Sequence, residues 1–157
     1  QNIQLFRGTV EDNIKINAED ISNDDFFAAS RLALVDEFAG QLPDAYKFRL
    51  NENGQGLSGG QKQSICWARA LSNQPNIMIL DEPTSAMDAD TERKILNNLE
   101  DFFDGRTILF CTHRTSFIEK STRVLILDKK GIKLDMPSKD YLSKIASLKT
   151  IDAKKIG

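Results

Sequence analysis

Two acidic residues, Asp81 and Glu82, directly follow the short apolar run Ile77–Leu80. An apolar run without alternation is typical of a strand buried on both faces of a parallel sheet. Ligands of open α/β sheets bind at the carboxyl ends of such strands. A carboxylate at that edge suits Mg²⁺, and its neighbour can orient or deprotonate an attacking water. Asp81 and Glu82 are therefore candidate metal-binding and catalytic residues, with two solvated loop acids as the alternative.

A second candidate site begins at Ser58, where the sequence reads Ser-Gly-Gly-Gln. Serine followed three residues later by Gln61 is a capping-box pattern, which predicts that a helix begins here. The uncovered amides of a helix end attract anions, and Gly59 and Gly60 allow a ligand to approach the backbone closely. The pattern thus indicates either a phosphate-binding helix end or a simple helix cap.

The only histidine, His113, follows a second apolar run, Thr107–Thr112. A lone histidine is more often structural than catalytic. If the two apolar runs are neighbouring parallel strands, however, His113 lies at the same sheet edge as Asp81, which favours a functional role.

The elements around these residues alternate between helix and strand, which predicts an α/β layer structure. A helix capped at Ser22 or Asn23 is expected to continue through Leu34, with Gly40 as a later stop. The other helices are expected near residue 9, where Thr9 is a cap, over Gly60–Leu71, after Asp88, and near Ser138–Leu148. A terminal hairpin is expected from Arg123–Leu127 and Ile132–Leu134.

The composition is that of an ordinary soluble globular protein: 40% of the 157 residues are hydrophobic and 28% are charged. The formal net charge of −2 lacks the basic excess of a nucleic-acid-binding protein. No apolar run approaches the roughly 18–20 residues of a transmembrane helix.

Cys66 and Cys111 belong to no metal-binding pattern and are predicted to be reduced core thiols, which fits a cytoplasmic compartment. Because Gln1 is not an initiator Met, we expect the chain to begin inside a longer protein.

Three motifs then occur in a fixed order: Leu57–Gln63 (LSGGQKQ), Ile79–Asp88 (ILDEPTSAMD) and Thr112–Arg114 (THR). Together they resemble the signature motif, the Walker B motif with its D-loop, and the H-loop of an ATP-binding cassette (ABC) ATPase. Gln1, followed by Leu5–Ile14, resembles the Q-loop and the next segment of exporters. The resemblance covers nearly the whole chain up to the final helix.

The resemblance implies an α/β, P-loop NTPase-like fold in which residues 1–157 form part of an ABC nucleotide-binding domain. A helical signature subdomain would occupy about residues 7–72, by the position of the signature motif in the family. Parallel-sheet core strands with the Walker B motif and the H-loop, followed by a hairpin, would occupy about residues 73–137, and a C-terminal helix and tail 138–157.

The resemblance also implies catalytic roles by position. Asp81 would hold Mg²⁺, and Glu82 would be the general base for hydrolysis. Gln1 would sense the Mg²⁺ and the attacking water, and His113 would contact the γ-phosphate.

Other motif residues would act between two subunits. The signature residues would contact ATP held by the opposite subunit; they are Ser58, Gly59, Gly60 and Gln61. Ser85 and Asp88, in the D-loop, would link the two sites.

The intact protein implied by this resemblance is an ATP-hydrolysing exporter with ATP and Mg²⁺ as ligands. Its partners would be a second nucleotide-binding domain in a head-to-tail dimer and a transmembrane domain, at the cytoplasmic face of the bacterial inner membrane, with no nucleic acid. Glu82–Asp88 and His113–Ser116 resemble type I secretion exporters of the adhesin and RTX kind, whose partners would include a periplasmic adaptor and an outer-membrane channel. Drug and lipid exporters differ at only a few of these positions. A DNA-maintenance ATPase is a further alternative, although residues 2–56 lack its sustained heptads.

A phosphate-binding P-loop, G-x-x-x-x-G-K-[S/T], is absent from the 157 residues. Only Gly54 and Gly59 have its glycine spacing, and Gly60-Gln61 follows them. We therefore expect this chain to be the C-terminal two-thirds of a nucleotide-binding domain and to be inactive alone, as a structural or regulatory half-site. Trp67 stands where smaller residues are commoner in the family and is not expected to touch the chemistry.

Overall fold

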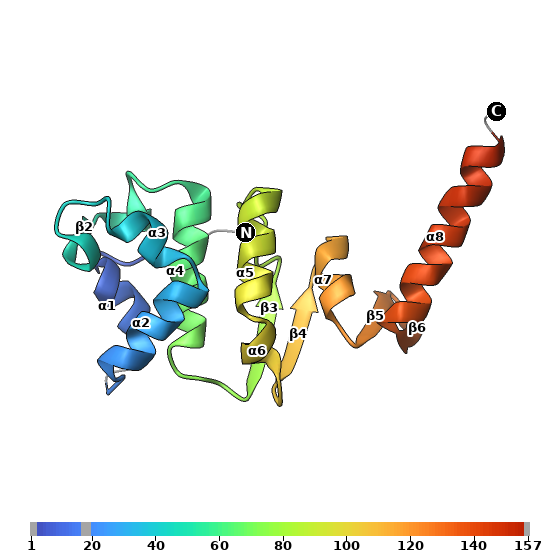
Figure 1. Ribbon diagram of the computed structural model, residues 1–157, viewed down its shortest axis with the longest axis horizontal. Helices are drawn as coiled ribbons and strands as arrows, with labels where there is room; N and C mark the ends of the chain where they lie inside the picture. Colours follow the sequence, from blue (N-terminus) through green and yellow to red (C-terminus); the bar gives the residue numbers. More distant parts are fainter. Residues whose placement is uncertain (1–2, 17–19, 156–157) are drawn as a thin grey trace. The chain divides into compact units, whose positions relative to one another are not determined.

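The computed structural model describes residues 3–16 and 20–155, with side chains as far as residue 147. The chain forms two compact units, Gln1–Cys111 and Thr112–Gly157, and each is considered by itself (Figure 1). The first unit contains β1 (Gly8–Thr9), α1 (Val10–Lys15), α2 (Asn23–Leu32), α3 (Val35–Ala39), the 3₁₀ helix η1 (Ala45–Lys47), β2 (Arg49–Leu50), the 3₁₀ helix η2 (Glu52–Gly54), α4 (Gly59–Leu71), β3 (Ile77–Asp81), α5 (Ala89–Asn98), α6 (Glu100–Phe103) and β4 (Thr107–Cys111). The second contains α7 (Thr115–Lys120), β5 (Arg123–Asp128), β6 (Gly131–Pro137) and α8 (Ser138–Lys155).

The first two helices begin where the sequence predicts. The hydroxyl of Thr9 accepts a hydrogen bond from the Asp12 N–H, and the Asp12 carboxylate accepts one from the Thr9 N–H at 2.8 Å. This reciprocal capping box satisfies two amides that lack partners inside α1. Ser22 caps α2 in the same way by accepting from the Asp25 N–H.

The prediction of one helix through Leu34 is wrong, because the helix breaks before that residue. α2 ends at Leu32, and Leu34 adopts left-handed backbone geometry with φ of 60° before α3 begins. The buried Leu34 side chain joins the hydrophobic core, and such packing offsets the strain of this conformation. Gly40 then follows the end of α3.

Helix α4 is the centre of the helical part, and α1, α2 and α3 all pack against it (Figure 1). It begins at Gly59, one residue before the predicted Gly60, and its cap is Ser58, so the predicted capping box is confirmed. Ile65, Ala68 and Leu71 lie on its core-facing side and are buried.

The two apolar runs form neighbouring parallel strands, as predicted. β3 pairs with β4 in register from Ile77 opposite Thr107 to Asp81 opposite Cys111. One face of this sheet packs on the core, where the rings of Phe103 in α6 and Phe110 in β4 meet at 5.7 Å between centroids. The carboxyl end of β3 therefore carries Asp81 on a supported strand.

The prediction that these strands are buried on both faces is wrong in this chain. Ile77 and Ile79 are 68% and 72% exposed, and Leu109 is exposed on the neighbouring strand. These side chains alternate with buried or half-buried ones, so they share one face of the pleated sheet. Over the described residues, these three apolar side chains are therefore largely open to solvent. Cys111 lies on the same face and is exposed, so its predicted core location is also wrong, whereas both cysteines are free thiols as expected.

The second unit is built on the predicted terminal hairpin. β5 and β6 pair antiparallel, with a register shift between Ile126 and Leu127. Gly131 follows the turn with φ of 117°, a conformation that favours glycine. α8 begins at Ser138 as expected and extends to Lys155, beyond the predicted end at Leu148.

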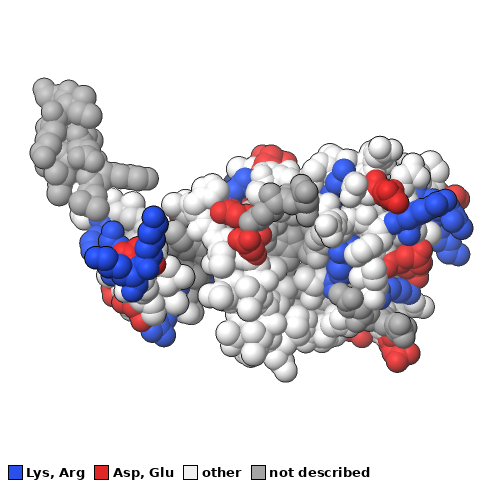
Figure 2. Space-filling model, turned by 180° about the vertical axis from the view of Figure 1, so that it is seen from behind, with Lys and Arg blue, Asp and Glu red and all other residues white. Residues whose placement is uncertain are grey.

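The described surface carries charges of both signs. On the face of the first unit shown in Figure 2, acidic and basic side chains are interspersed. Over the described residues, no helix is both long and apolar enough to span a bilayer.

Candidate active site

The acidic pair stands at the junction of β3 and the turn that follows it. Asp81 is the last residue of β3 and is exposed, whereas Glu82 is half-buried. Glu82 has left-handed backbone geometry, with φ of 44°, and its N–H donates to the Cys111 carbonyl at 2.8 Å. The bond extends the β3–β4 ladder by one residue, so the predicted general base is anchored to both strands.

The turn after Glu82 is also held by two side chains of α4. The Gln63 amide donates to the Glu82 carbonyl at 3.2 Å and accepts from the Ala86 N–H at 2.9 Å. The indole N–H of Trp67 donates to the Pro83 carbonyl at 2.8 Å. Residues 63 and 67 lie four positions apart, on one face of α4.

A cavity of about 230 Å³ lies where α4 meets this turn. Asp81, Glu82, Ser85 and Gln63 form its polar side, and Ile79 and Trp67 contribute apolar surface. Cys66 also lines it, and burial raises the pKa of its thiol. The cavity thus brings an acidic pair next to an apolar wall, an arrangement common in ligand sites.

The donors present fit Mg²⁺ bound in part by protein. Asp81 and Glu82 offer hard carboxylate oxygens, which this ion prefers. The described residues contain no group of three or more His, Cys, Asp and Glu side chains that could enclose a metal. Mg²⁺ normally keeps several waters and uses one or two carboxylates together with substrate phosphates, so the pair is a suitable partial site.

The predicted phosphate-binding helix end lies at the start of α4. The Gln61 N–H donates to the Ser58 hydroxyl at 3.1 Å, and the Gln61 side chain accepts from the Ser58 N–H at 2.8 Å. A Cβ added at Gly59 would lie 3.1 Å from the Ala86 Cβ, tighter than most Cβ contacts. The close approach that Gly59 permits in this structure is therefore to the residue-86 turn of its own chain.

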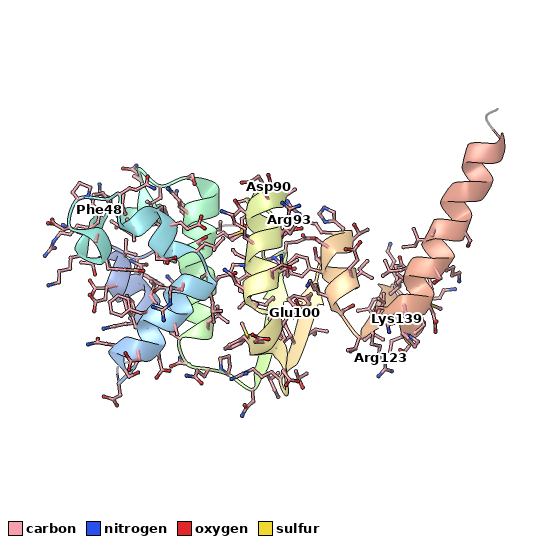
Figure 3. The ribbon with its side chains drawn as sticks, in the orientation of Figure 1. Phe48, Asp90, Arg93, Glu100, Arg123 and Lys139 are labelled. Atoms are coloured by element: carbon pink, nitrogen blue, oxygen red, sulfur yellow. The ribbon has the colours of Figure 1, made fainter. Side chains whose placement is uncertain are left out.

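The D-loop residues lie between the acidic pair and α5. Asp88 caps α5 by accepting from the N–H groups of Asp90 and Thr91, and the hydrogen bond from the Thr91 backbone is the main cause of its lowered pKa. Asp90, in the first turn of α5, pairs with Arg93 on the exposed surface of that helix (Figure 3). Ser85 is exposed, and its hydroxyl accepts from the Gln63 amide at 3.4 Å.

The structure thus brings together Asp81, Glu82 and Ser85 in one cavity. His113 belongs to the second unit, two residues after β4, and stays a candidate by its motif. Gln1 lies outside the described residues. The sequence reasoning missed Gln63 and assigned Trp67 no part near the chemistry, although both line the cavity. A polar residue on the apolar face of a predicted helix was the available signal for Gln63.

Comparison with known proteins decides the family. A family model described as ABC transporter matches residues 1–85, more than half of the chain. The chain belongs to the ABC transporter family. The resemblance inferred from the three motifs is thereby confirmed.

Several curated members of the ABC transporter family are similar to this chain. The cyclolysin secretion/processing ATP-binding protein CyaB of Bordetella pertussis is 44% identical over 128 residues, which cover 82% of this chain and 18% of that protein. The ATP-dependent lipid A-core flippase of Legionella pneumophila strain Paris is 44% identical over 127 residues, 81% of this chain and 22% of the flippase. The chain thus spans about a fifth of the length of these relatives.

A solved structure extends the likeness to the fold. The structure of a bacterial Atm1-family ABC exporter with ATP bound matches all of this chain and 27% of that chain, with a TM-score of 0.84 and 31% sequence identity. The predicted fold class, an α/β, P-loop NTPase-like fragment of an ABC ATPase, is confirmed.

Proposed function

We propose that this chain supplies the hydrolytic acid pair, the signature helix and the D-loop of the ATP-binding domain of an ABC exporter. The observation that carries the proposal is the cavity in which Asp81 and Glu82, at the carboxyl end of a parallel strand, face α4. Membership of the ABC transporter family and the likeness to an exporter with ATP bound support ATP as the substrate.

In the proposed reaction, Asp81 would hold Mg²⁺, which would neutralise charge on the phosphates. Glu82 orients the attacking water and accepts its proton. Its backbone is held by β4 and α4, and such positioning is most of the catalysis of phosphoryl transfer. Gln1 and His113 are proposed, by motif position, to act on the water and the γ-phosphate.

A second nucleotide-binding domain is the proposed partner in a head-to-tail dimer. The residues proposed to contact its ATP are Ser58, Gly59, Gly60 and Gln61, at the start of α4. An anion is favourable there because the positive end of a helix faces it. Ser85 and Asp88 are proposed to link the two sites.

The proposed exporter also contains a transmembrane domain and works at the cytoplasmic face of the bacterial inner membrane. Its cargo is proposed to be a protein, as in type I secretion, with a periplasmic adaptor and an outer-membrane channel as partners. CyaB and the exotoxin translocation ATP-binding protein PaxB of Pasteurella aerogenes support this choice. The lipid A-core flippase, at the same 44% identity as CyaB, makes a lipid the second candidate cargo.

The phosphate-binding loop is proposed to lie in a part of the intact protein outside these 157 residues. The isolated chain is therefore proposed to bind no ATP. The division at about residues 72 and 137 into a signature subdomain, a core and a C-terminal helix is proposed on the order of the motifs in the family. Calorimetric titration of Mg-ATP into the isolated chain tests the lack of binding, and saturable heat that Asp81→Asn abolishes would contradict it.

The proposed catalytic roles are tested in the full-length protein. Glu82→Gln should lose ATP hydrolysis and keep ATP binding, because the amide cannot accept the proton. Asp81→Asn should weaken binding in Mg²⁺ far more than in EDTA. Asp90→Asn is the matched control, because Asp90 is exposed on α5 and pairs with Arg93. Hydrolysis that survives Glu82→Gln unchanged would refute the proposal.

A further inference from the structure

Glu82 occupies a backbone conformation that needs support from its surroundings. Its φ of 44° lies in the left-handed region, which residues with a side chain rarely adopt. Such conformations persist only where neighbouring structure fixes them, and they gather at functional sites. The groups that hold the Glu82 backbone therefore help to set the direction in which its carboxylate points into the cavity.

Two elements hold the backbone on either side of the Glu82 Cα. β4 holds the preceding peptide, because the Glu82 N–H donates to the Cys111 carbonyl. α4 holds the following peptides, through Gln63 at the Glu82 carbonyl and Trp67 at the Pro83 carbonyl. The Gln63 side chain also accepts a hydrogen bond from the Ala86 N–H, so its amide group binds the backbone at both ends of the turn.

The bond from Trp67 to the Pro83 carbonyl is buried, whereas the bond from Gln63 to the Glu82 carbonyl is part-buried. Trp67 is 2% exposed and Gln63 is 6% exposed. A buried carbonyl that loses its donor gains no replacement from solvent, so the turn must move or remain unsatisfied. A small displacement of a catalytic group is enough to slow a reaction substantially.

We infer that Gln63 and Trp67 are positioning residues for Glu82: they fix the residue 82–86 turn so that the Glu82 carboxylate meets the attacking water. This inference rests on the proposed function, in which Glu82 is the general base. The same helix begins at Gly59, directly after its cap Ser58, so one rigid element carries both the signature residues and the anchors of the base.

Trp67→Phe in the full-length exporter is the decisive variant, since it keeps an aromatic ring and removes the indole N–H. We expect its kcat for ATP hydrolysis to fall about tenfold, with KM for ATP unchanged within about twofold. Gln63→Met, which removes the amide at similar length, should do the same. Asp90→Asn is the control, because Asp90 is exposed on α5, where it pairs with Arg93, and its kcat should stay near the wild-type value.

A second comparison separates positioning from general damage to the fold. In the Glu82→Gln background, Trp67→Phe should leave the residual hydrolysis rate unchanged, because no base remains to be positioned. Loss of folded protein would instead lower the rate by the same factor in both backgrounds.

Three outcomes overturn the inference. The first is a wild-type kcat in both Trp67→Phe and Gln63→Met. If Glu82→Gln has nevertheless lost nearly all hydrolysis, the proposed function stands and only the positioning role is refuted. Equal loss in the two backgrounds would show a structural role alone. A Glu82→Gln protein with wild-type kcat would refute the proposed function and this inference together.

Discussion

Thr84 offers a direct measure of how strongly the turn after the acidic pair is tied to α5. Its hydroxyl donates to the Glu92 carboxylate, and the two residues are 1% and 5% exposed. Thr84→Val keeps the branched shape and removes only the hydroxyl. Because a buried carboxylate then loses a charge-assisted partner, we expect the free energy of unfolding to fall by about 1.5–3 kcal/mol.

Urea unfolding followed by tryptophan fluorescence measures this loss. Trp67 is the only tryptophan, and its indole donates to the carbonyl of Pro83, the neighbour of Thr84. The signal therefore reports on the unit that contains the changed contact. With a urea m-value of about 2 kcal/mol/M, the expected loss lowers the midpoint by about 1 M and leaves the slope unchanged.

Thr91→Val is the matched control. The Thr91 hydroxyl donates to the Asp88 carboxylate at 2.8 Å on the exposed side of the α5 cap. Water can replace that donor, so we expect a much smaller shift than for Thr84→Val. Equal urea midpoints for the two variants would refute the reasoning, because burial of the hydrogen bond would then make no difference to the free energy of unfolding.

Two further predictions concern titration and reactivity. The hydrogen bond from the Thr9 N–H is the main cause of the lowered pKa of Asp12. A carboxylate with a depressed folded pKa stabilises the fold above its unfolded pKa of about 3.9, and that stability is lost as the pH falls through the folded value. Asp12→Asn should therefore make the free energy of unfolding less dependent on pH below about 4, and an unchanged acid dependence in urea titrations would contradict this. Because burial raises the pKa of the Cys66 thiol while Cys111 is exposed, iodoacetamide should alkylate Cys111 first; peptide mass spectrometry checks the order, and faster labelling of Cys66 would count against it.

Local features of this chain were predictable because their causes are local. The caps at Thr9, Ser22 and Ser58 depend on a side chain and an amide three residues away, so the sequence contains both partners. The parallel pairing of β3 and β4 followed from two apolar runs separated by a helical segment. The position of Asp81 at a sheet edge therefore follows from the order of residues along the chain.

Other features depend on contacts between distant segments. Trp67 and Pro83 are adjacent only after α4 packs beside the turn that follows β3, so no spacing in the sequence predicts their hydrogen bond. The break at Leu34 is a case in which burial of one side chain overrides the helical pattern. The exposure of Ile77 and Ile79 was missed because an apolar run has the same composition whether one face or both are covered.

The packing of α4 has a consequence for how this sequence can evolve. A helix at a protein surface usually has a solvent side on which substitutions accumulate with little effect. Within this fully described helix, every residue after Gly59 is buried or half-buried, since α1–α3 contact one part of it and the residue 82–86 turn another. Random mutagenesis with selection for folded protein should therefore leave α4 as the least variable helix of the first unit, with far fewer surviving substitutions than the amphipathic α5.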